Sequence, residues 1–168
     1  MSLTVTVLGT PAPQGSKRHV GRGVMVESSE KVKPWREAVK WAFSDYTHAD
    51  GAPGILLTGP VRVDLVFTLI KPRSAPKTRR TWPAKRPDLD KLIRSTLDGL
   101  TDSGVIRDDA QIVTLTAAKR YPSEGARALS TPGAWICITD LSADELDRLA
   151  ERHAKTHPTR ISATPEAT

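Results

Sequence analysis

The sequence predicts a single domain of mixed α/β structure, in the α+β class, with a mixed sheet of about four strands and two to three helices. The chain has 168 residues, enough for one domain with its own hydrophobic core. Several short segments alternate apolar and polar residues with the period of a β-strand, and others repeat apolar residues at helical spacing. We expect the main domain to cover residues 1–140, followed by a C-terminal helix over 141–155 and a flexible tail over 156–168.

The first predicted elements are a strand and a helix. Residues 3–8 alternate as a strand does, and the Gly and Pro residues that follow end it. A helix is expected over residues 33–46, because a proline is tolerated in the first turn. Its residues Ala38, Trp41 and Ala42 fall on one face with Trp35 nearby, and we expect both tryptophans to lie in the core or in an interface.

The clearest strand covers residues 61–70. Every second residue is apolar, and Arg62, Asp64 and Thr68 lie on the opposite face. The next segment, residues 71–87, combines prolines with many basic residues and has no periodicity. It predicts a loop that is ordered or partly mobile.

A second helix and two further strands follow this loop. Apolar residues recur at helical spacing over residues 89–102, with Asp88 as a suitable N-cap and Gly104 as a suitable stop. Residues 111–121 and 133–140 have the character of strands, and a loop containing Ser, Gly and Pro separates them. We expect these two strands to pair with each other in antiparallel fashion.

The chain carries 25 Lys and Arg residues against 19 Asp and Glu residues, a net charge of +6. This excess favours an anionic partner, and nucleic acid rather than a membrane, because no basic amphipathic helix stands out. The one cysteine cannot form an intramolecular disulfide, and no segment resembles a membrane span or a signal peptide. We therefore expect a cytoplasmic protein.

Four aspartates near the basic residues predict a metal site. Asp88 and Asp90 can converge on one cation if Asp88 is still extended at the start of the helix, because residues i and i+2 of an extended segment point to the same side. Asp108 and Asp109 precede the next strand and should point in opposite directions, so at most one of them joins the first two. Three carboxylates without a Cys/His cluster favour Mg²⁺ or Mn²⁺.

Ordinary structural roles are open for each of these residues. Asp88 can serve as a plain N-cap, Asp90 as a first-turn acid beside the helix dipole, and the two later aspartates as turn residues. Arg94 lies four residues after Asp90 and four before Asp98, so it can form a surface ion pair with either. Trp82 can be packed against the protein or can stack on a nucleic-acid base.

The distribution of charge favours a catalytic interpretation. Residues 71–94 contain nine Lys and Arg residues but only two acids. A basic loop that leads directly into a carboxylate pair suits a metal-dependent nuclease, in which Lys and Arg bind phosphates while the cation activates water. A merely solvated loop is the alternative.

A close resemblance to the core signature of the RusA family of Holliday junction resolvases is carried by residues 87–113, PDLDKLIRSTLDGLTDSGVIRDDAQIV. In that signature a Pro-Asp-x-Asp motif opens a helix, a Leu-Asp-x-Leu step follows, and an Asp-Asp pair precedes a strand. The N-terminal strand with GTPAPQGSKR after it, and residues 119–121, also fit the family, so the resemblance covers about residues 3–140. It implies a homodimeric, Mg²⁺-dependent endonuclease of mixed α/β fold that nicks two opposing strands of a four-way DNA junction symmetrically.

The resemblance also implies roles for individual residues. The metal-binding acids of the family fall on Asp88, Asp90 and Asp109. Its catalytic lysine falls on Arg94, a departure, because a guanidinium can stabilise negative charge but cannot readily exchange a proton. The Asn that usually follows the second Asp is here Lys91, whose ammonium is a second candidate for the cationic role.

Binding would then depend on basic residues and cutting on the acids. Phosphate contacts, with recognition mainly of branched shape, are expected from Lys17, Arg18, Arg79, Arg80, Lys85, Arg86 and Lys91. Two alternatives are a Mg²⁺-dependent nuclease for other branched DNA, such as flaps or forks, and a non-catalytic protein that binds branched DNA. The resemblance also points to a phage or prophage origin in a bacterial host.

Overall fold

The computed structural model describes residues 1–15, 17–19, 25–27, 30–47 and 57–141. From residue 142 onward, the predicted C-terminal helix and tail lie outside the described residues. None of the helices in the described part of the chain is long and apolar enough to cross a membrane.

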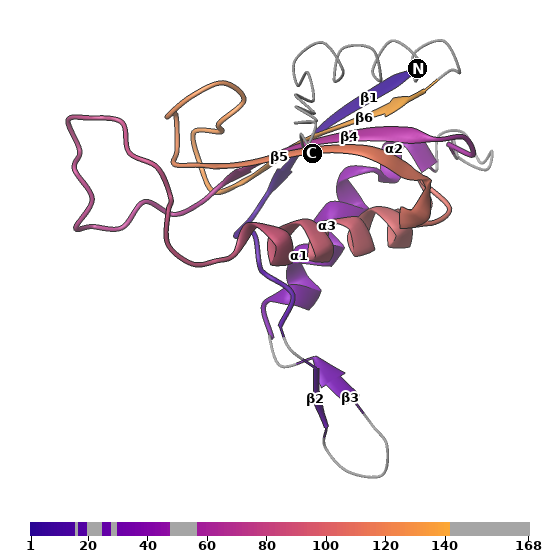
Figure 1. Cartoon of the computed structure of the whole chain (residues 1–168), viewed down its shortest axis with the longest axis horizontal. Helices are drawn as coiled ribbons and strands as arrows, with labels where there is room; N and C mark the ends of the chain where they lie inside the picture. Colours follow the sequence, from indigo (N-terminus) through magenta and orange to yellow (C-terminus); the bar gives the residue numbers. More distant parts are fainter. Residues whose placement is uncertain (16, 20–24, 28–29, 48–56, 142–168) are drawn as a thin grey trace, which may run out of the picture.

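A four-stranded mixed sheet forms the centre of the fold, in the order β1, β6, β4 and β5 (Figure 1). Its strands are β1 (Ser2–Leu8), β4 (Val61–Thr68), β5 (Ile112–Arg120) and β6 (Gly133–Asp140). β6 is antiparallel to both β1 and β4, whereas β4 is parallel to β5. A separate antiparallel pair consists of β2 (Lys17–His19) and β3 (Met25–Glu27). The predicted mixed sheet of an α+β domain is therefore confirmed.

The predicted pairing of residues 111–121 with residues 133–140 is wrong, because β4 lies between β5 and β6. β4 is apolar on one face and also buries Asp64 and Thr68 on the other, so both of its faces are covered, as in a central strand. The Asp64 carboxylate is compensated by Arg62, whose Nε lies 2.9 Å from Asp64 Oδ2. The connection from β4 to the parallel strand β5 is a long crossover that includes α3, the usual arrangement for parallel strands.

Two long helices, α1 (Val32–Ala42) and α3 (Leu89–Ser103), pack against the same face of the sheet (Figure 1). A short helix, α2 (Ser44–Thr47), follows α1, and a 3-10 turn, η2 (Asp109–Gln111), precedes β5. The buried face of α1 carries Val32, Trp35 and Val39, whereas Trp41 is 69% exposed. The prediction of a core position is therefore wrong for Trp41, because α1 turns its Val32–Val39 stripe toward α3 and the sheet, whereas Ala38 and Ala42 are half-buried and pack against the core.

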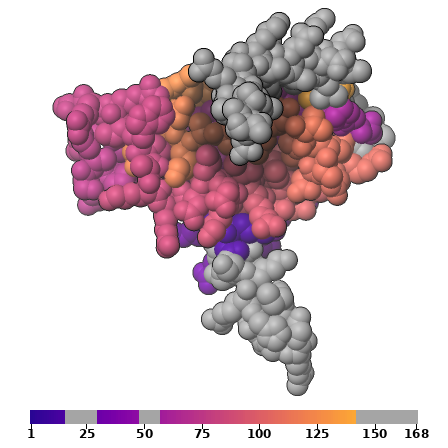
Figure 2. Space-filling view, in the orientation of Figure 1, coloured from indigo at the N-terminus to yellow at the C-terminus, as the bar shows by residue number. Residues whose placement is uncertain are grey.

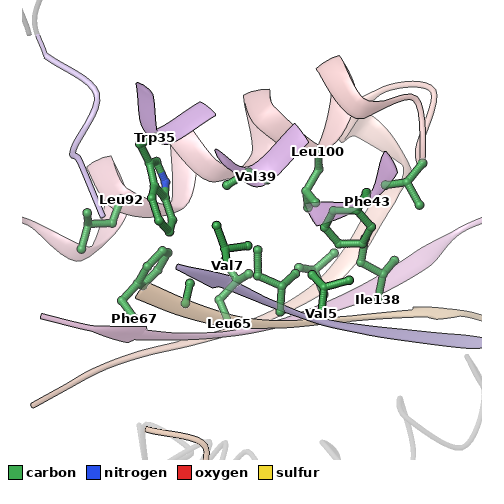
Figure 3. Close-up of a cluster of buried hydrophobic side chains, with 14 of the residues drawn as sticks. Val5, Val7, Trp35, Val39, Phe43, Leu65, Phe67, Leu92, Leu100 and Ile138 are labelled. Atoms are coloured by element: carbon green, nitrogen blue, oxygen red, sulfur yellow. The ribbon is translucent and has the colours of Figure 1, made fainter. Parts of the chain in front are cut away.

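The core lies between these two helices and the sheet (Figure 3). Within it, Trp35 Nε1 donates to Thr96 Oγ1 over 3.0 Å, so this buried polar pair is satisfied. Gly99 lets α3 approach α1, since a Cβ atom at this position would lie 2.9 Å from Val39 Cβ and 3.2 Å from the Arg36 carbonyl oxygen. The close contact between the helices therefore depends on the missing side chain.

Gly99→Ala is expected to destabilise the fold by about 1 kcal/mol, within a net range of about 0–2 kcal/mol. Overpacking costs about 1–3 kcal/mol, and the better helix propensity of alanine offsets about 1 kcal/mol of it. The free energy of unfolding should be measured by urea denaturation, with Asp102→Ala at an exposed position of α3 as the control. Higher stability of Gly99→Ala would show that the helices can separate without cost.

Candidate active site

The first turn of α3 presents two acids to solvent. Asp88 occupies the N-cap position with an extended backbone, at φ −71° and ψ 138°, as predicted. Its side chain accepts no hydrogen bond from the helix, so it does not act as the cap. The side chains of Asp88 and Asp90 are both exposed. Both carboxylates are therefore available as oxygen ligands for a hard cation.

Two cationic side chains follow these acids on α3. Lys91 Nζ lies 3.5 Å from Asp88 Oδ2, which places an ammonium beside the first acid. Arg94 is exposed and forms no salt bridge with any described residue. Its predicted surface ion pair is therefore not formed, and Asp98 instead pairs with Arg36 of α1.

Lys119, near the end of β5, holds the segment in front of the acids. Its Nζ donates to Lys85 O over 3.0 Å and to Pro87 O over 2.9 Å. The parallel register places Lys119 opposite Phe67 near the end of β4, and this brings it to the start of α3. Residues 119–121 are part of the family resemblance, but the sequence could not predict the contacts of this lysine, because its partners are backbone carbonyls more than 30 positions away.

The loop after β1 braces the same turn of α3. Gln14 N donates to Lys91 O over 2.9 Å. Ser95 Oγ, which is buried, donates to Ala12 O over 2.6 Å. Segments that are distant in the sequence therefore meet around the first turn of α3 and hold it in place.

The acids of the second pair, Asp108 and Asp109, differ in their contacts: one has a structural role, and the other is free of hydrogen bonds from the described residues. Asp108 Oδ1 accepts from Ala110 N over 2.8 Å, and Gln111 Oε1 accepts in return from Asp108 N over 3.1 Å. This capping box uses Asp108 to begin η2. Asp109 is exposed, and its side chain accepts no hydrogen bond from the described residues. Of the two acids, Asp109 is thus the one that is available as a ligand.

Asp88 and Asp90 lie at the start of α3, whereas Asp109 belongs to η2, which follows the other end of that helix. The 15 residues of α3 make it about 22 Å long. β5 then runs back along the sheet, and about 23 Å separate Ile112 from Lys119, which holds the start of α3. Across the described ranges, no three acidic, His or Cys side chains lie close enough to hold a metal ion together. One chain therefore has two of the predicted ligands at one end of α3 and the third at the other.

The basic loop, residues 71–87, has neither helix nor strand, as predicted, but it is attached to the loop between β5 and β6. Glu124 of that second loop accepts from Lys71 Nζ and, through Oε2, from Thr81 N over 2.9 Å. The two loops lie side by side at one end of the sheet, next to the start of α3 (Figures 1 and 2). One carboxylate thus holds the basic loop beside the acids.

The predicted DNA-binding residues gather mainly on this loop and on α3. Those exposed there are Arg79, Arg80, Lys85, Arg86 and Lys91. Lys17 and Arg18 belong to β2, and their side chains lie outside the described part of the structure.

The contacts of Glu124 make the attachment of the basic loop dependent on pH. The Lys71 ammonium and the Thr81 N–H hold the pKa of the Glu124 carboxyl below its usual value of 4.5. The attachment is therefore complete above that value and is lost as the pH falls through the lowered pKa.

An NMR titration of the Thr81 amide should detect this, with a midpoint below 4.5. Glu124→Gln should abolish the titration, whereas Glu30→Gln at an exposed position should not. A midpoint at or above 4.5 would contradict the contact.

Comparison with known protein families identifies a match over most of the chain. The family model described as Endodeoxyribonuclease RusA matches residues 9–129. This range contains the basic loop, the acids at the start of α3, and Asp109. No match was found among the curated proteins.

Proposed function

The chain belongs to the RusA family of endodeoxyribonucleases, and we propose that it resolves four-way DNA junctions by paired, symmetric nicks in a Mg²⁺-dependent reaction. One observation carries this proposal. The carboxylates of Asp88 and Asp90 are exposed, Asp88 makes no capping hydrogen bond, and both lie beside a basic loop that Glu124 holds in place. Uncompensated carboxylates would repel the DNA, whereas a bound divalent cation inverts the local charge. Mn²⁺ is expected to substitute for Mg²⁺, because both prefer oxygen ligands.

The proposed roles of the side chains follow from their chemistry. Asp88, Asp90 and Asp109 supply carboxylate oxygens. A divalent cation held by them would supply Lewis-acid chemistry, which lowers the pKa of water and offsets charge on the phosphate, and the expected products are a 5′-phosphate and a 3′-hydroxyl. Arg94 adds a permanent positive charge for the transition state, whereas Lys91, beside Asp88, can also exchange a proton.

A homodimer would overcome the separation of the acids within one chain. A second copy that places its Asp109 beside Asp88 and Asp90 completes the ligand set, and two-fold symmetry then produces two equal sites. Edge strand β5 begins next to Asp109 and exposes Val113 by 53% and Leu115 by 40%, an apolar surface of the kind that a second copy would cover. Two equal sites also match the two opposing strands of a junction.

The basic residues are proposed to bind the junction by its branched shape. Phosphate contacts position a duplex without reading its sequence. The residues proposed for these contacts are Lys17, Arg18, Arg79, Arg80, Lys85, Arg86 and Lys91.

The proposal is tested by cleavage of a labelled four-way junction beside a linear duplex and a flap of matched sequence, each with Mg²⁺ or EDTA. We expect paired, symmetric nicks confined to the junction and absent in EDTA. Preferential cutting of the flap would favour a nuclease for other branched DNA. Tight junction binding without cutting, in Mg²⁺ and in Mn²⁺, would overturn the catalytic proposal and leave a protein that binds branched DNA.

A further inference from the structure

Trp82, in the basic loop, lies against two guanidinium groups. The Cζ atom of Arg80 is 4.6 Å from the centroid of the Trp82 ring, and that of Arg120 is 4.5 Å from it. Arg80 belongs to the same loop, whereas Arg120 ends β5. Trp82 is 59% exposed, and its ring makes cation–π contacts with both groups.

The two guanidinium groups also meet at one backbone position, Gly125. A Cβ atom there would lie 2.6 Å from Arg80 Nη2 and 3.3 Å from Arg120 Nε. Gly125 has a φ of 129°, which residues with side chains rarely adopt, so its backbone favours glycine as well. The missing side chain allows two positive charges to approach each other.

No carboxylate within the described residues forms a salt bridge with either arginine, although the Arg80 charge is among those that lower the pKa of Glu124. Glu124, the adjacent acid, is occupied by an ammonium and a backbone N–H of the basic loop. Neither Arg80 nor Arg120 forms a salt bridge in the described part of the chain. Arg120 Nη1 donates to Lys119 O over 2.8 Å, while its buried Nε has no hydrogen-bond partner among these residues. Two like charges held together in this way repel each other, and a further anion bound between them would reduce that repulsion.

We propose that Arg80 and Arg120, aligned by Trp82 and Gly125, bind one backbone phosphate of the DNA. This inference rests on the proposed function. Guanidinium groups match phosphate oxygens with paired N–H donors and form strong, charge-assisted hydrogen bonds with them. The contact with the ring orients both groups without neutralising their charge.

The place of this phosphate relative to the acids follows from Lys119. That residue directly precedes Arg120 and donates to Pro87 O, immediately before Asp88. A strand held by the arginine pair would therefore pass close to the first turn of α3. Phosphate contacts fix the register of a protein on the DNA, so the arginine pair would determine which phosphodiester reaches the acids. The pair would not take part in the cutting itself.

The test is the salt dependence of junction binding, measured by fluorescence anisotropy in EDTA. The logarithm of the binding constant falls linearly with the logarithm of the salt concentration, and each phosphate contact contributes about 0.9 to the slope of that line. Loss of one contact should therefore weaken binding about tenfold near 0.1 M salt. We expect this for the double variant Arg80→Gln with Arg120→Gln, and a loss of up to this size for each single variant. Because both arginines hold the same phosphate, the double variant should lose no more than one contact.

Two further variants serve as controls, and circular dichroism should establish that each protein is folded. Arg73→Gln removes the charge of another exposed arginine of the loop and should change the slope less. Trp82→Leu keeps both charges but should still weaken binding, because the ring no longer aligns them. The shared site would be wrong if the arginine variants had the same salt-dependence slope as Arg73→Gln. It would also be wrong if the double variant lost about two phosphate contacts. Wild-type binding by Trp82→Leu would overturn the role of the ring.

Failure of the arginine site and failure of the proposed function are distinguishable. If the wild-type protein binds the junction but never cuts it in Mg²⁺, the catalytic proposal fails while the slopes still decide the arginine site. If the wild-type protein cuts and the variants keep its slope, the arginine site fails by itself.

Discussion

Junction cleavage by Asp88→Asn should fall at least about 100-fold, because the loss of groups that merely support metal ligands already costs about 10–100-fold. Junction binding should be unchanged or tighter, since the substitution removes a negative charge from a surface that contacts phosphates. Single-turnover cleavage rates and dissociation constants from fluorescence anisotropy measure these two effects separately.

Asp45→Asn is the matched control, because Asp45 is an exposed acid on α2, away from the start of α3. This variant should cut at nearly the wild-type rate. A folded Asp88→Asn protein that cuts normally would exclude the acid from the reaction. If it instead lost junction binding, the proposed division between acids that cut and bases that bind would be wrong.

Mixing Asp88→Asn with Asp109→Asn should restore cleavage to about one quarter of the wild-type level, if each site takes its Asp109 from the second copy. In a mixed dimer, one site then carries both substitutions and the other carries neither. With free exchange of subunits about half of the dimers are mixed, and each of these has one intact site. Each variant tested separately should be inactive.

A mixture of Asp88→Asn with Asp90→Asn is the control for this experiment. Both substitutions lie in the same half of the site, so no mixed dimer has an intact site. The active mixture should also make single rather than paired nicks, because one strand of the junction meets a defective site. Equal inactivity of the two mixtures, with subunit exchange verified by mass spectrometry of tagged chains, would contradict a shared site.

Local patterns predicted most of the helices and strands, but not which elements pack or pair with one another. The limits of β1, β4 and α3 agree with prediction within two residues, because the alternation and the helical spacing of apolar residues reflect burial of one face. Gly104 ends α3 with a φ of 78°, as a glycine stop should. The partner of β5 and the exposure of Trp41 were missed, because a periodic pattern identifies a face without identifying what covers it.

The same limit applies to the candidate site. Asp88 and Asp90 stand out because a short motif separates them by two positions at the start of a helix. Lys119 and Glu124 gave no comparable signal, since they bind backbone groups more than 30 positions away. Such partners become neighbours through strand register and loop contact, which no window of the sequence contains.

The order of the residues was enough to place the basic loop beside Asp88 and Asp90, because neighbours along a chain remain neighbours in any fold. Folding decided that Asp109 lies beyond the far end of a helix about 22 Å long and that Arg120 joins Arg80 at Trp82. The physical reason is that chain connectivity restricts distance over only a few residues. Over longer separations, the length of α3 and the parallel register of β5 determine which groups meet.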